Sequence, residues 1–174
     1  MENTFMEIER KFLLSAFPED LPLKGRFEVC QAYLSTEPEV RIRRRTAESG
    51  ETAYFLTIKS GGGLARREVE LSIQGEQFQA LADMVPHPFI RKELRLYELP
   101  GGLELECSLV DRGSETEFMY AEVEFPSVKA AERFTPCFGY DREITRCPGS
   151  GMKHYWRRTR EGETRRDGDR FSAL

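Results

Sequence analysis

Charged side chains recur at every second position in several short segments of this sequence. The first segment places Glu7, Glu9 and Lys11 in alternation, and a later one does the same with Arg41 and Arg43. In a β-strand the residues i and i+2 lie on one face, so each segment would present its charges as a row. Further rows are formed by Lys59 among apolar neighbours, by Arg66, Glu68 and Glu70, by Glu104 and Glu106, and by Glu122 and Glu124.

Carboxylate rows and cationic rows together favour one kind of chemistry. Two like charges 4 Å apart repel by about 4 kcal/mol at an effective dielectric constant of about 20, so such rows usually persist where an opposite charge lies between them. Carboxylate oxygens suit Mg²⁺ or Mn²⁺, and arginine guanidinium groups match phosphate oxygens in pairs of hydrogen bonds. The two sets on one surface predict a site for a metal–polyphosphate complex.

The same spacing is also typical of an ordinary sheet whose polar face lies in water. Solvent-facing rows usually mix Thr, Ser and Gln with the charges, whereas these rows consist almost wholly of Glu, Lys and Arg. Spacing alone leaves the solvated face and the metal–phosphate surface both open. The glycine run at residues 61–63 lacks the GK[ST] that follows in a phosphate-binding loop, so it indicates a hairpin turn.

Short alternating runs separated by turn residues predict a mainly β (α+β) fold. An eight-stranded closed antiparallel β-barrel with short peripheral helices fits this pattern better than an open sheet, because closure removes exposed strand edges. The expected strands are residues 6–13, 28–34, 39–45, 53–59, 66–73, 89–97, 103–110 and 118–125, and the expected helices are 74–84 and 127–133.

The composition limits the partners. The chain has 174 residues, 32% of them charged, and a net charge of −4, which argues against binding to duplex nucleic acid. It contains no apolar run of membrane-spanning length and no secretory signal, so we expect a cytoplasmic protein without a membrane partner. The four cysteines lack CxxC spacing and are expected to be free thiols. We expect one domain over residues 1–155 and a charged tail over 156–174, with monomer and homodimer both open.

The segment that begins at Glu7 also carries a family resemblance. It matches the ExExK pattern that opens the CYTH superfamily, the triphosphate tunnel metalloenzymes, and later segments follow in the family's order. The blocks EIERKFL, YLS, RIR, LTIK and AEVEF resemble most the short bacterial members that act on inorganic tripolyphosphate. The resemblance spans about residues 7–145. It implies a divalent-metal-dependent triphosphatase, a phosphoanhydride hydrolase, with its charged rows inside the barrel.

The resemblance implies a role for each charged row. Mg²⁺ or Mn²⁺ would be held by Glu7, Glu9, Glu68, Glu70, Glu122 and Glu124, and the triphosphate by Lys11, Arg41, Arg43, Lys59, Arg66 and Arg95. Lys11 and Tyr33 resemble a lysine–tyrosine pair proposed to assist the attacking water in some short members, since a neighbouring ammonium lowers the pKa of a phenol. Tyr33 also fits the interpretation of an aromatic residue in the barrel wall.

Three segments depart from the family pattern. The usual Lys-x-Arg strand becomes RKELR, in which we assign Arg95 to the phosphate site and leave the choice between Arg91 and Lys92 open. The strand over residues 103–110 carries Ser108 where an aspartate normally ends the charged row. The family's tyrosine–asparagine pattern after the segment 143–145 is replaced by CPGSGMKHYW.

Metal-dependent hydrolysis of inorganic tripolyphosphate or a related triphosphate is the function that these observations favour. Catalysis would come from positioning and electrostatics, with no covalent nucleophile. Two related activities stay open, a class IV-like adenylate cyclase and a thiamine triphosphatase. The three departures also leave open a non-catalytic polyphosphate- or nucleotide-binding protein.

Overall fold

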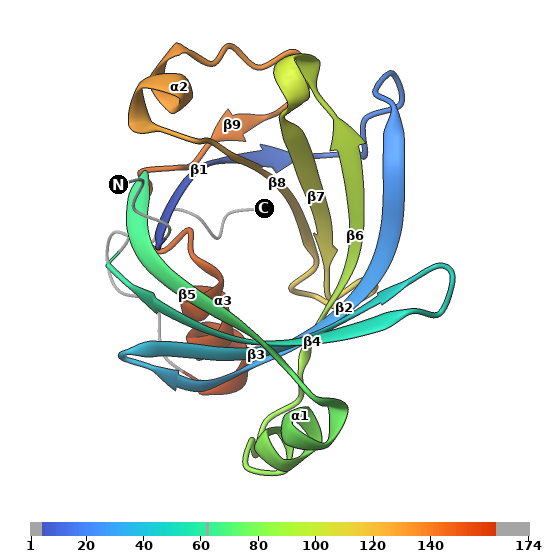
Figure 1. Cartoon of the computed structure of the whole chain (residues 1–174), viewed down its shortest axis with the longest axis vertical. Helices are drawn as coiled ribbons and strands as arrows, with labels where there is room; N and C mark the ends of the chain where they lie inside the picture. The colour runs from blue at the N-terminus through green and yellow to red at the C-terminus, as the bar shows by residue number, and fades with distance from the viewer. Residues whose placement is uncertain (1–4, 62, 163–174) are drawn as a thin grey trace.

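The computed structural model describes residues 5–61 and 63–162, which fold around one closed antiparallel β-barrel of eight strands (Figure 1). The strand order is β5-β4-β3-β2-β6-β7-β8-β1, and β1 pairs with β5 to complete the ring. The barrel strands are β1 (Met6–Leu14), β2 (Leu23–Thr36), β3 (Glu39–Ala47), β4 (Thr52–Ser60), β5 (Ala65–Ile73), β6 (Ile90–Glu98), β7 (Glu104–Val110) and β8 (Phe118–Glu124). A short strand, β9 (Arg142–Glu143), lies beside β1.

Each of the eight expected strands falls on one observed strand, so the predicted barrel is confirmed. The largest difference is at β2, which begins at Leu23 instead of at residue 28. Its first residues, LKGRF, pair with β6 and contain a register shift beside Gly25, which obscures the alternation that marks a strand in the sequence. The two expected helices are α1 (Gly75–Ala82) and α2 (Val128–Arg133), and a single 3-10 turn spans Pro100–Gly102.

Strand β1 occupies the seam at which the barrel closes. One of its edges pairs with β8 over six residues, while its other edge pairs first with β5 and then with β9. The register places Glu7 opposite Arg66 of β5 and Glu9 opposite Glu124 of β8. The first and last strands of the barrel, β1 and β8, therefore lie side by side, and their charged rows meet at Glu9 and Glu124.

Helix α3 (Met152–Arg160) packs at one end of the barrel. Trp156 is 1% exposed and its ring lies 5.7 Å from that of Tyr33. Asp111 anchors the helix by accepting hydrogen bonds from Tyr155 and Arg160, each at 2.6 Å. The segment expected as a charged tail thus begins as a packed helix, because its aromatic residues bury themselves against the barrel. Residues 163–174 of that tail lie outside the described residues.

All four cysteines are free, and Cys107 is fully buried in the apolar layer outside the barrel wall. Within residues 5–61 and 63–162, no helix combines the length and the apolar character that crossing a bilayer requires.

Candidate active site

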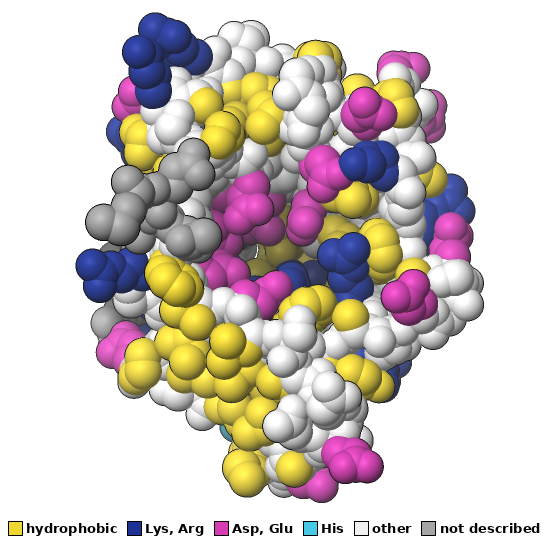
Figure 2. Space-filling model, viewed as in Figure 1, with side chains coloured by type: hydrophobic (Ala, Val, Ile, Leu, Met, Phe, Trp, Pro, Cys, Tyr) yellow, Lys and Arg dark blue, Asp and Glu magenta, His cyan; other side chains and the backbone are white. Residues whose placement is uncertain are grey.

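The barrel encloses a cavity of about 430 Å³ with a strongly charged wall. Among the described residues, seven Lys or Arg and nine Glu line it, and Figure 2 shows acidic side chains gathered around its opening. The charged lining residues are Glu7, Glu9, Lys11, Glu39, Arg41, Arg43, Arg45, Lys59, Arg66, Glu68, Glu70, Lys92, Glu104, Glu106, Glu122 and Glu124. The charged rows therefore face inward, and the interpretation as a solvated outer face is wrong.

The two-residue period of the strands explains this arrangement. On β3, Arg41 and Arg43 point into the cavity, while Ile42 between them is fully buried in the apolar cluster. On β8, Glu122 and Glu124 line the cavity, while Val123 packs in the layer beneath α2. Because the apolar partners bury outside the barrel, the charged residues have only the interior left to occupy.

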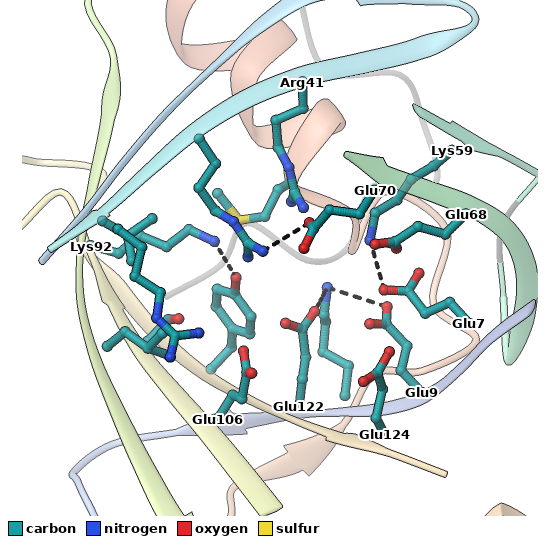
Figure 3. A pocket seen from close by; sticks show the side chains of 18 of the residues that line it. Glu7, Glu9, Arg41, Lys59, Glu68, Glu70, Lys92, Glu106, Glu122 and Glu124 are labelled. Atoms are coloured by element: carbon teal, nitrogen blue, oxygen red, sulfur yellow. Dashed lines mark hydrogen bonds and ion pairs between the residues drawn. The ribbon is translucent and has the colours of Figure 1, made fainter. Parts of the chain in front are cut away.

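Glu7 lies at the centre of an ion-pair cluster where β1, β4 and β5 meet (Figure 3). Its carboxylate accepts hydrogen bonds from Lys59 Nζ at 2.7 Å and from Arg66 Nε at 2.5 Å. Lys59 Nζ also contacts Glu68 at 2.5 Å. Burial alone would raise the pKa of Glu7, but Lys59 and Arg66 hold that pKa well below its usual value. This carboxylate stays ionised.

Strands β1 and β8 carry three further carboxylates with contrasting environments. Glu122 lies 2.5 Å from Lys11 Nζ, and this ammonium outweighs burial to hold the pKa of Glu122 at about 2. Burial and the neighbouring Glu122 charge raise the pKa of Glu9 to about 7. Burial and other cavity carboxylates raise the pKa of Glu124 to about 7 as well. The cavity therefore holds more carboxylate charge than its cations neutralise.

The opposite side of the cavity is cationic and comes from β3 and β6. Arg43 forms an ion pair with Glu70 at 2.9 Å. Lys92 Nζ donates a hydrogen bond to the Tyr120 hydroxyl at 2.6 Å (Figure 3). Burial, joined by the nearby charges of Arg41, Lys11 and Arg43, lowers the pKa of Lys92 to about 7. This side of the cavity would gain from an added anion.

Comparison with known proteins places the chain in a family. The inorganic triphosphatase of Nitrosomonas europaea is 38% identical over 143 residues, which cover 80% of this chain and 89% of the relative. The chain belongs to the CYTH superfamily. The crystal structure of the inorganic triphosphatase NE1496 has a TM-score of 0.57 at 33% identity, over 86% of this chain and 93% of that one. The PH1819 protein of Pyrococcus horikoshii shares the fold, with a TM-score of 0.51 at 19% identity over 68% and 76% of the two chains. No family model matches the sequence.

All but one of the residues that the CYTH resemblance selected line the cavity. The exception is Arg95, and its assignment to the phosphate site is wrong. Arg95 lies on the outer face of β6, where its guanidinium stacks over Phe17 at 3.8 Å and pairs with Glu93 at 2.6 Å. Lys92 and Leu94 are the β6 residues that line the cavity, which resolves the choice between Arg91 and Lys92 in favour of Lys92.

The structure does not form the lysine–tyrosine pair that the CYTH resemblance suggested. Lys11 Nζ is directed to Glu122 and Glu9, and no hydrogen bond joins it to Tyr33 within the described chain. The Tyr33 hydroxyl instead donates to Glu39 Oε1 at 3.5 Å. Burial raises the pKa of Tyr33, opposite to the lowering that an activated phenol requires. The observed lysine–tyrosine hydrogen bond in the cavity joins Lys92 to Tyr120.

The sequence assignment gave no site role to several residues that line the CYTH cavity. Those with polar side chains are Glu39, Arg45, Lys92, Glu104, Glu106, Ser108 and Tyr120. Parity could have placed six of them in the cavity, since Glu39 and Arg45 continue the row of Arg41. Glu104 and Glu106 form one row with Ser108, and Tyr120 precedes the row of Glu122 by two residues. Lys92 carries no such signal, because Arg91, Glu93 and Arg95 place charges on the opposite face of β6 as well.

The acidic side of the cavity has the donor chemistry for a divalent cation. Glu9 and Glu124 are directly opposite each other in the β1–β8 register, and burial and neighbouring carboxylates raise the pKa of both, even though Arg66 and Lys11 lie near Glu9. Mg²⁺ and Mn²⁺ prefer such oxygen ligands. Among the described residues no three acidic, histidine or cysteine groups already converge as a metal cluster. The reason is that Glu7 and Glu122 are directed to lysine and arginine partners.

Proposed function

We propose that this chain hydrolyses inorganic tripolyphosphate, or a closely related triphosphate, with the help of Mg²⁺ or Mn²⁺. The observation that carries the proposal is the enclosed cavity in which carboxylates of β1 and β8 face the cations of β3 and β6. Carboxylates alone would suit a metal buffer, and cations alone would suit a simple anion site. The relative of 38% identity named inorganic triphosphatase supports the same reaction.

The cations would hold the phosphate chain by exchanging partners. Lys59 and Arg66 now contact Glu7, and Arg43 contacts Glu70. Phosphate oxygens offer these groups equally charged acceptors, and guanidinium forks bind them in pairs. Lys11, Arg41 and Lys92 complete the proposed set of phosphate ligands, with Lys92 taking the place first given to Arg95.

The carboxylates would hold the metal on the other side of the chain. The proposed ligands are Glu7, Glu9, Glu68, Glu70, Glu122 and Glu124, all of which line the cavity. A bound divalent ion would neutralise charge on the phosphate oxygens and orient water for attack. In hydrolysis a water oxygen bonds to the terminal phosphorus while the bridging P–O bond breaks, and pyrophosphate leaves. Fixed cations at these oxygens favour the spread of negative charge in the transition state.

Tyr33 has no proton-accepting role in this proposal. Its pKa is raised by burial, and its ring packs against Trp156. Glu122 and Glu9 outweigh the effect of burial and raise the pKa of Lys11. Its ammonium group therefore stays charged and acts here as a phosphate ligand. Both side chains therefore stay protonated at neutral pH.

The test is release of phosphate by the purified chain from tripolyphosphate, ATP and thiamine triphosphate, each with Mg²⁺, with Mn²⁺ and with a chelator. We expect release from tripolyphosphate with metal and none with the chelator. Formation of cyclic AMP from ATP would replace the proposal with a cyclase. Metal-dependent binding of tripolyphosphate without turnover would replace it with a binding protein.

A further inference from the structure

A second, smaller compartment of about 250 Å³ adjoins the main cavity. We call it the rear compartment. It is lined by Glu9, Lys11, Glu39, Gly61, Gly63, Arg66, Thr145, Arg146, Cys147, Pro148, Gly149, Ser150, Gly151, Lys153 and His154. Its outer wall is the segment of residues 145–154, and from Cys147 onward this wall belongs to the run CPGSGMKHYW that departs from the family pattern.

The two compartments share a partition of four charged residues, Glu9, Lys11, Glu39 and Arg66. Arg66 contacts Glu9 at 3.3 Å and Glu39 at 3.7 Å, and Lys11 lies 4.0 Å from Glu9. These contacts within the partition are ion pairs between side chains. The two cations of the partition therefore border both spaces, and a phosphate group on either side can compete for them.

The two compartments differ in the sign of their charge. The described lining of the main cavity has seven Lys or Arg against nine Glu, whereas that of the rear compartment has four Lys or Arg against two Glu. Arg146 and Lys153 supply the additional positive charge, and both Glu residues belong to the partition. Charges in an enclosed space interact through a lower effective dielectric than in water, so the rear compartment attracts anions.

The outer wall also allows a small anion to approach closely. Between Arg146 and Lys153 the wall consists of Cys147, Pro148, Gly149, Ser150 and Gly151. These small side chains leave room for an anion, while the N–H groups of Cys147 and Ser150 already donate to the carbonyls of Ile144 and Cys147. Arg146 is exposed and lies near the Glu143 carboxylate, and from this position its guanidinium can reach a bound group from the solvent side.

We propose that the rear compartment is a binding site for a phosphate group, held by Arg146 and Lys153 on one side and by Lys11 and Arg66 of the partition on the other. Its enzymatic role rests on the proposed function, since the phosphate comes either from hydrolysis or from the substrate chain. In the first case the site receives inorganic phosphate released by the reaction. In the second it holds the fourth phosphate of a chain longer than tripolyphosphate. Both ligands present the same phosphate oxygens.

The first experiment measures binding of inorganic phosphate by isothermal titration calorimetry. The test variant is Arg146→Ser with Lys153→Ser, and the matched control is Arg91→Ser with Lys129→Ser, which removes the same charge from exposed positions outside both compartments. We expect the test variant to bind phosphate about tenfold more weakly than wild type and the control to bind it normally. Equal affinity in the test variant and the control overturns the proposal. The single variant Arg146→Ser, at an exposed position, provides the same comparison if the double variant does not fold.

The second experiment identifies the source of the phosphate. If the site receives the product, phosphate inhibits tripolyphosphate hydrolysis in wild type and about tenfold more weakly in the test variant. If it holds a fourth phosphate, the test variant loses kcat/KM for tetrapolyphosphate and keeps it for tripolyphosphate. No change in either measurement overturns an enzymatic role for the site. Failure of the proposed function is recognised separately, because wild type would then release no phosphate from tripolyphosphate while the calorimetry still reports on the site.

Discussion

The charged side chains of the acidic wall and of the basic wall of the cavity are neutralised in different ways. On the acidic wall, formed by β1, β7 and β8, Glu122 is neutralised by Lys11, whereas Glu9 and Glu124 lack a sufficient counter-charge and have pKa values of about 7. On the basic wall, formed by β3 and β6, Arg43 has Glu70 as its partner, while Lys92 has a phenol. Surplus carboxylates can take up protons, but arginine cannot lose one.

This difference indicates that the two walls require two different partners. The surplus on the acidic wall can be relieved by a cation, and the basic wall, whose arginines stay charged, can be stabilised further by an anion. A metal–triphosphate complex supplies both at once. Substitutions on the two walls should therefore have separable effects on metal-dependent turnover and on phosphate binding.

Removing one charge from the acidic wall should abolish most of the activity. Glu122→Gln removes a proposed metal ligand and the partner of Lys11, so we expect kcat for tripolyphosphate to fall by about a hundredfold or more. Glu115→Gln, at an exposed loop position, is the matched control and should behave as wild type. Steady-state kinetics at several Mg²⁺ concentrations provide the measurement. Wild-type turnover by Glu122→Gln would remove Glu122 from the metal site.

Removing one charge from the basic wall should affect binding of the phosphate chain. Arg43→Gln deletes a guanidinium in the cavity, and loss of a charge-assisted contact worth about 1.5–3 kcal/mol raises KM by about tenfold to a hundredfold. Arg44→Gln changes the adjacent exposed residue, whose side chain contacts Cys30 outside the cavity. Equal KM values for these two variants would contradict the assignment of the basic wall to phosphate.

The smallest effect concerns stability and follows from Lys92. Burial lowers its folded-state pKa to about 7 from 10.5, so the folded chain binds fewer protons than the unfolded chain between these values. The free energy of unfolding therefore rises with pH between 7 and 10.5. The charged, buried form of Lys92 destabilises the fold below pH 7, and this destabilisation is absent above pH 10.5. Lys92→Met should therefore raise Tm most below pH 7, by several degrees at roughly 2–4 °C per kcal/mol, and less as the pH rises toward 10.

Thermal unfolding of the metal-free protein from pH 6 to pH 10 tests this expectation. The charged and titratable groups around Lys92 are Lys11, Arg41, Arg43, Glu106, Glu122 and Tyr120. Arg95→Met on the outer face of the same strand removes a partly exposed ion pair with Glu93 and the stacking over Phe17, and it should shift Tm equally at every pH in this range. A Tm difference between Lys92→Met and wild type that does not vary with pH would show that Lys92 is charged throughout.

Most of the barrel was predictable because its rows have a strict period of two. Arg41 and Arg43 alternate with Val40 and Ile42, so the shared face of the arginines follows directly from the sequence. The β6 segment RKELR could not be resolved in this way, since both of its faces carry charge. Only its place beside Phe17 outside the barrel decides that Arg95 faces outward. The packing of helix α3 against the barrel was not predicted, because its charged residues concealed the short aromatic face of Tyr155 and Trp156.

The sequence by itself determined which charged residues share a face and, through the ordered CYTH blocks, which family the chain belongs to. It did not determine which charges become partners. Barrel closure decides that Glu7 meets Arg66, and that Lys11 pairs with Glu122 instead of activating Tyr33. The physical reason is that strand periodicity is local, whereas electrostatic pairing and burial depend on strands that are distant in sequence and adjacent only in the closed barrel.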